Sequence, residues 1–140
     1  MAITQAVCNS FKQELLQGLH DLDGNTLKLA LYTSSATLDA STTAYSTTNE
    51  SSGTGYTAGG ETVTSVAVSL SGNVAFVDFA DVSFTSATIS DAAGALLYNS
   101  SVSDKAIAVI DFGSTKSVTG GTLTITLPSA NASNALIRVS

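Results

Sequence analysis

Apolar residues alternate with small polar residues in many short segments of this chain, and turn-forming residues separate the segments. A period of two places successive side chains on opposite faces of a β-strand. The segments are residues 26–33, 62–70, 74–79, 82–89 with a break at Ser86, 93–98, 105–112, 123–127 and 134–139. We expect residues 26–33 to form a half-buried strand and residues 113–121 to form a loop. Ser71, Gly72 and Asn73 are typical of the tight turn of a hairpin. The pattern predicts a mainly β protein, an antiparallel β-sandwich or barrel of about eight short strands.

A helical period occurs only near the N-terminus. One apolar residue recurs at every fourth position there: Ile3, Val7, Phe11, Leu15 and Leu19. Turn residues at 23–25 end this stretch, so we expect one N-terminal α-helix over residues 2–22. Residues 26–140 then form the β-sandwich, and residues 1–140 make a single domain. The apolar stripe of the helix is covered either by its own sheet or by a neighbouring subunit.

Residues 34–61 are rich in serine, threonine and glycine, and they carry Tyr45 and Tyr56. We expect a long loop, which in a compact domain is usually functional or disordered. Tyrosines among small polar residues are typical of an adaptable contact surface. They are equally typical of a surface loop that its tyrosines fasten to the sheet. The sequence leaves both interpretations open.

The residues that carry enzyme chemistry are scarce. The chain has one histidine, His20, one cysteine, Cys8, and only 11% charged residues. We interpret Cys8 as a small buried residue and His20 as a helix-terminal histidine that faces solvent or the helix dipole. Residues 21–25 begin like a calcium loop, but the glycine stands at the fourth position instead of the sixth. We therefore expect no enzyme activity, no catalytic residues, no cofactor and no metal site.

The charge of the chain limits its partners. Its 140 residues carry a formal net charge of −6 with only five basic side chains. This disfavours binding to nucleic acid and attraction to an anionic membrane. The N-terminus lacks the features of a secretory signal, and the apolar stretches are too short to span a bilayer. We therefore expect synthesis in the cytoplasm without a signal peptide.

Several sequence segments, taken as a set, resemble a known family. They are LKLALYTSSATL at residues 27–38, SGTGYTAGG at 52–60, GALLYNS at 94–100, AVIDFGS at 108–114 and NALIR at 134–138. This set is similar to small virion proteins encoded by tailed bacteriophages. The resemblance implies a β-rich structural protein of the particle, located in the virion after synthesis in the host cytoplasm. It carries over no catalytic residues, and it does not distinguish head from tail.

The surface composition and this resemblance lead to the same expectation. A charge-poor surface of hydroxyl side chains suits packing against neighbours. We expect a capsid decoration or cement protein that binds the outer head shell as an oligomer and stabilises it. Its partners would be the major capsid protein and copies of itself, with a trimer as one arrangement. The candidate interface residues are Phe11, Leu15, Leu19, Tyr45 and Tyr56.

Two alternatives remain at this stage. The first is a head-fibre or tail component that presents a surface-binding loop. The second belongs to another class, a carbohydrate-binding β-sandwich module. Such modules usually present aromatic platforms, and this chain has no tryptophan and only 6% aromatic residues.

Overall fold

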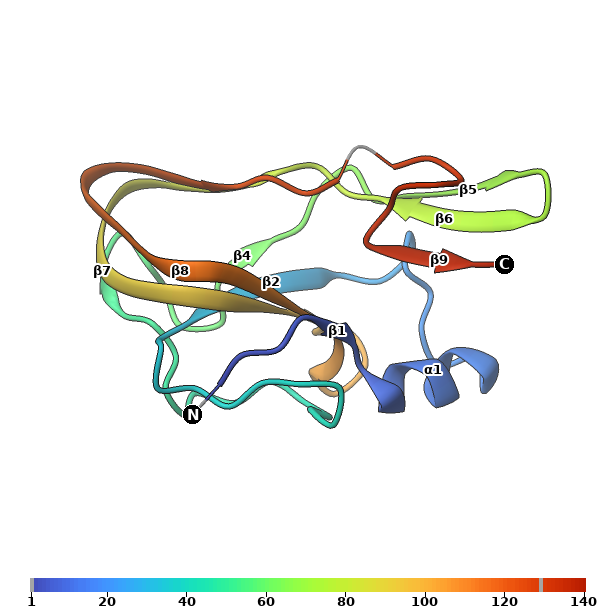
Figure 1. The fold of residues 1–140 in the computed structure, drawn as a ribbon, viewed down its shortest axis with the longest axis horizontal. Coiled ribbons are helices and arrows are strands. Elements are labelled where there is room, and N and C mark those ends of the chain that lie inside the picture. The colour runs from blue at the N-terminus through green and yellow to red at the C-terminus, as the bar shows by residue number, and fades with distance from the viewer. Residues whose placement is uncertain (1, 129) are drawn as a thin grey trace.

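The computed structural model describes residues 2–128 and 130–140 and shows a mainly β protein with one short helix (Figure 1). The elements in chain order are β1 (Ala6–Val7), α1 (Asn9–Leu16), β2 (Leu27–Tyr32), β3 (Gly53–Thr54), β4 (Glu61–Thr62), β5 (Ala67–Ser71), β6 (Val74–Asp78), β7 (Val82–Asn99), β8 (Lys105–Ile125) and β9 (Ile137–Val139). The strands pair antiparallel in two sheets. The predicted fold class is confirmed.

The larger sheet, with the order β1-β8-β7-β2-β4 and β3 paired to β7, contains the centre of the core. Leu29 pairs with Leu97, and Leu97 pairs with Ala108; each of the three is at most 1% exposed. On the opposite face of β2, Ala30 and Tyr32 are buried as well. The sequence predicts a half-buried β2, but both of its faces are covered. Residues 34–61 cover the second face, because Tyr45 stacks on Tyr98 and the Tyr32 hydroxyl donates to the Ser46 carbonyl.

The two longest strands correct the expectation of uniformly short strands. β7 and β8 form one hairpin that runs from the pair Val82 and Ile125 to the pair Asn99 and Lys105. The expected break at Ser86 and the expected loop at 113–121 both lie within these strands. Register shifts interrupt the pairing at these places. Bulges bend a strand without ending it, so the hairpin curls back over the sheet (Figure 1).

The predicted helix over residues 2–22 is wrong in its length. α1 covers only Asn9–Leu16, and the preceding residues Ala6 and Val7 pair with Val109 and Ala108 of β8. β8 therefore supplies hydrogen-bond partners for the backbone groups of Ala6 and Val7, which in a helix would bond to other residues of that helix. After α1 the chain turns at Gly18, which has a positive φ of 74°. Glycine adopts this conformation without steric cost, and it is common just past the end of a helix.

The smaller sheet has the order β5-β6-β9 and lies beyond the end of the large hairpin, above α1 in Figure 1. The expected strand over 62–70 is split, because the chain passes Ser65 with a φ of 54° between β4 and β5. The expected hairpin turn around Gly72 is confirmed. The expected final strand over 134–139 is shorter, since β9 comprises only Ile137–Val139.

Candidate interaction surface

The acidic side chains of the strands do not converge into a site. Asp81 accepts a hydrogen bond from the Leu127 amide, Asp91 from the amide and hydroxyl of Ser34, and Asp111 from the Gly113 amide. Among residues 2–128 and 130–140, no three histidine, cysteine or acidic side chains gather where they could hold a metal ion. Asp81 and Asp91 therefore connect segments that are far apart in the chain, and Asp111 holds the residues that follow it.

His20 is buried, which corrects the expectation that it faces solvent. Its Nε2 lies 3.1 Å from Glu14 Oε1, and its Nδ1 lies 3.1 Å from Asn99 Nδ2. Because the amide nitrogen of Asn99 can only donate, the ring proton sits on Nε2 and is donated to Glu14. Lys105 Nζ lies 3.1 Å from the other oxygen of Glu14. The network therefore joins the end of α1 to the turn of the large hairpin.

Opposing effects act on the carboxyl group of Glu14. Burial by itself raises its pKa, since a charged group loses solvation in the interior. Hydrogen bonds from His20 and Lys105, together with the positive charge of Lys105, outweigh burial and hold the pKa below its ordinary value of 4.5. Glu14 is thus an ionised carboxylate within a structural network.

Cys8 is fully buried, as expected from the sequence. Burial, with the nearby charges of Asp39 and Glu14, raises the pKa of its thiol to about 11. A thiol is nucleophilic only as the thiolate, so Cys8 is unreactive near neutral pH.

A carboxylate, Glu50, holds residues 34–61 against the large sheet. Its Oε2 accepts a hydrogen bond from the Tyr45 hydroxyl at 2.6 Å, and its Oε1 accepts from the Tyr56 hydroxyl at 2.7 Å. The Gly59 amide donates to Oε1 at 2.7 Å. The Tyr56 hydroxyl in turn accepts a hydrogen bond from the Leu31 amide in β2. We call Glu50, Tyr45, Tyr56 and Gly59 the tyrosine clamp.

The clamp favours one of the two interpretations that the sequence leaves open for Tyr45 and Tyr56. Both hydroxyls are engaged inside the chain, and the Tyr45 ring stacks on Tyr98 with 4.7 Å between the ring centroids. Burial and the hydrogen bond to Glu50 raise the pKa of both tyrosines above the usual range. This is the arrangement of a fastened loop. A role of their partly exposed rings in contacting a partner stays a prediction.

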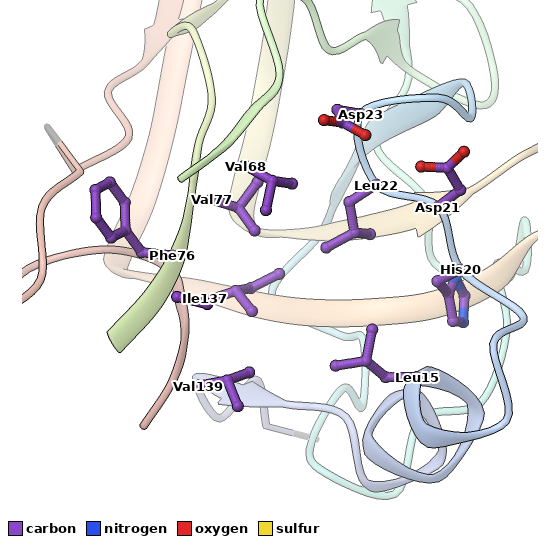
Figure 2. A pocket seen from close by; sticks show the side chains of 11 residues that line it. Leu15, His20, Asp21, Leu22, Asp23, Val68, Phe76, Val77, Ile137 and Val139 are labelled. Carbon is purple, nitrogen blue, oxygen red and sulfur yellow. The ribbon is translucent and has the colours of Figure 1, made fainter. Parts of the chain in front are cut away.

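An apolar groove of about 350 Å³ lies between α1, residues 20–23 and the small sheet. Figure 2 shows Leu15, Leu22, Ile137 and Val139 turned toward this space, with the carboxylates of Asp21 and Asp23 at its margin. The full lining comprises Leu15, His20, Asp21, Leu22, Asp23, Val68, Ala75, Phe76, Val77, Ile137 and Val139. The expected interface residue Leu15 therefore lines a concave surface.

The other two expected interface residues of the helical stripe lie in different surroundings. Phe11 is 1% exposed and packs in the core, with its ring centroid 4.9 Å from that of His20. Leu19 is 43% exposed. The stripe is thus divided between the interior and the surface, because α1 ends before Leu19.

One face of the small sheet is apolar and only partly covered. Its inner row is Val68, Val77 and Ile137, and its outer row is Leu70, Ala75 and Val139. In the inner row, Val77 and Ile137 are buried, whereas Leu70 of the outer row is 73% exposed and Val139 is 53% exposed. Sequence reasoning found the alternation of β5 and β6, but it did not name these residues as contacts. A period of two identifies a face without showing what covers it.

The outer part of β8 presents a different surface. Residues 113–117 are Gly-Ser-Thr-Lys-Ser, and all five are exposed. Lys116 Nζ is occupied by the Ser114 hydroxyl at 2.9 Å. This arm of the hairpin offers many hydroxyl groups and very little charge.

The comparisons with known proteins give no match, since no family model fits the sequence and neither curated proteins nor solved structures show a significant likeness to it. Within the described residues, no helix has the length and apolar character needed to cross a membrane.

Proposed function

We propose that this chain is a structural protein of a tailed-phage virion, a capsid decoration protein that binds the outer head shell as an oligomer and stabilises it. The observation that carries the proposal is the contrast between its polar and apolar groups. The side chains of His20, Glu14 and Glu50 are engaged in internal hydrogen bonds and ion pairs, while the outer part of the apolar face of the small sheet, with Leu70 and Val139, is exposed. Exposed apolar patches mark interaction sites.

The proposed partners are the major capsid protein and other copies of the chain. Contacts between neutral, hydroxyl-rich surfaces need little desolvation of charge, and the exposed arm of β8 has this composition. A shell displays its subunits in many identical copies, so modest contacts repeated around it add up to strong retention. In this mechanism no substrate is transformed. The resemblance of the sequence to small virion proteins supports the same assignment.

The test compares phage particles with and without this protein. Particles that lack it should release their genome at a lower temperature, which a DNA-binding dye measures during a thermal ramp. Adding the purified protein back should restore the release temperature. Equal release temperatures with and without the protein would contradict a stabilising role.

Electron microscopy of the same particles distinguishes the alternatives within the virion. Density of this chain on the outer head shell supports the decoration role, whereas density on head fibres or the tail would assign it to those structures. Binding to glycans by the purified protein would instead favour a carbohydrate-binding module. Against that class, the hydroxyls of Tyr45 and Tyr56 are bonded inside the chain, so these rings form no free platform.

A further inference from the structure

The apolar groove is lined mainly by aliphatic side chains, and the charged side chains at its rim are both acidic. Aliphatic side chains from α1 and the small sheet form most of its lining, and the charged residues at its margin are Asp21 and Asp23. Neither carboxylate takes part in an ion pair within the described residues. The groove therefore suits an aliphatic side chain that has a positive charge close by.

The surface beside the groove supplies that combination. Leu16 follows the groove residue Leu15 on α1 and is 90% exposed, the largest exposure among the bulky apolar side chains described. Lys12 lies one turn before Leu16, is exposed, and has no carboxylate within ion-pair distance among the described residues. Residues four apart are neighbours on a helix surface. Lys12 is also three residues before the groove residue Leu15, so Lys12 and Leu16 lie on the part of α1 that adjoins the groove.

We propose that two copies of this chain associate through this surface, with Leu16 of each copy in the apolar groove of the other. Lys12 of each copy then faces Asp21 and Asp23 of its partner. Leu16 is next to the groove residue Leu15 in α1, and a two-fold axis makes the contact reciprocal, so that each copy supplies one leucine and one groove.

The pairing also accounts for the exposed outer row of the small sheet. Leu70 and Val139 border the groove from the sheet side, and a second copy seated there removes them from water. An interface typically has an apolar centre and a polar rim. Here the centre is the groove with Leu16, and the rim is Lys12 with the two aspartates. The inference rests on the proposed function in that the pair is the unit that decorates the shell.

Sedimentation equilibrium of the purified full chain tests the pairing. The wild-type chain should form a dimer, and Leu16→Ser should raise its dissociation constant by at least about tenfold, because each pair loses two buried leucine side chains. Leu16→Met keeps an apolar side chain and should retain the dimer. Since Leu16 is 90% exposed, neither change threatens the fold of the monomer. A wild-type chain that stays monomeric, or that forms a trimer, would overturn the proposal.

A charge exchange tests the orientation of the two copies. Lys12→Asp and Asp23→Lys should each weaken the dimer, because like charges then meet across the interface. The double variant should recover most of the lost affinity, and the recovery should shrink in high salt. Lys116→Asp makes the same charge change on the distant arm of β8 and should leave the dimer unchanged. If the double variant instead loses as much dimer affinity as the two single variants together, the proposed orientation is wrong.

Head binding is measured separately, by mixing the wild-type chain with heads that lack it. Binding to heads by a chain that is monomeric in solution would overturn the pairing and leave the proposed function standing. A dimer that does not bind heads would overturn the proposed function and leave the pairing standing.

Discussion

The two sheets of this protein share an alternating pattern but differ in what covers them. In the large sheet, β2 is buried on both faces, with Leu29 fully buried on one face and Ala30 on the other. In the small sheet, the residues of β5 are all exposed, although Val68 and Leu70 alternate with polar residues in the same way. The difference teaches that alternation determines which residues share a face, whereas tertiary contacts determine whether that face meets water.

The largest predicted effect is the loss of stability when a core side chain of the large sheet is shortened. Leu97→Ala should lower the free energy of unfolding by about 2–5 kcal/mol, because it leaves a cavity in the core beside Leu29 and Ala108. Leu70→Ala in the small sheet should cost less than about 0.5 kcal/mol, since Leu70 is 73% exposed in the monomer. Urea denaturation of the dilute monomer measures both. Equal costs would mean that the small sheet is covered in solution.

A second, intermediate effect concerns residues 34–61, which cover one face of β2. Glu50→Ala should cost roughly 1–3 kcal/mol, because two tyrosine hydroxyls and the Gly59 amide lose their acceptor. Glu61→Ala, at an exposed position of β4, is the matched control and should have little effect. Limited proteolysis should show faster cleavage within residues 34–61 for the first variant only. Unchanged proteolysis would mean that the clamp does not hold this segment.

The smallest predicted effect is a pH dependence at the junction of α1 and the large hairpin. The folded pKa of Glu14 is lowered, so the folded state favours its ionised form. The stabilisation is complete above the ordinary value of 4.5 and is lost as the pH falls through the lower folded pKa. Glu14→Gln should therefore flatten the loss of stability below pH 4.5, as followed by urea denaturation across that range. An unchanged acid profile would show that other carboxyl groups dominate it.

Much of the fold could be predicted from the sequence, because its signals are local. β2 and the hairpin of β5 and β6 follow from alternation and from the turn at Gly72. The expected break at Ser86 and the expected loop at 113–121 are wrong, because a turn and a bulge use the same residue types. Only the pairing partner shows that β7 and β8 continue through them.

The candidate site was less predictable, because its contacts are distant in sequence. His20 meets Asn99, which lies 79 residues further along the chain, so no local pattern indicates that the ring is buried. The groove joins α1 to β9, again from opposite ends of the chain. The tyrosine clamp is an exception, since Tyr45 and Tyr56 lie within six residues of Glu50. The carboxylate between two tyrosines was a signal that sequence reasoning could have used.

The strand order of the small sheet has a consequence for synthesis on the ribosome. β5 and β6 emerge early, but their third strand, β9, follows the whole of β7 and β8 in the chain. An isolated two-stranded hairpin is marginally stable in water, so this hairpin must wait for β9. The wall of the groove that carries Val139 is therefore the last part to assemble, after the large sheet can already have formed. The proposed pairing through the groove therefore cannot begin before β9 is in place.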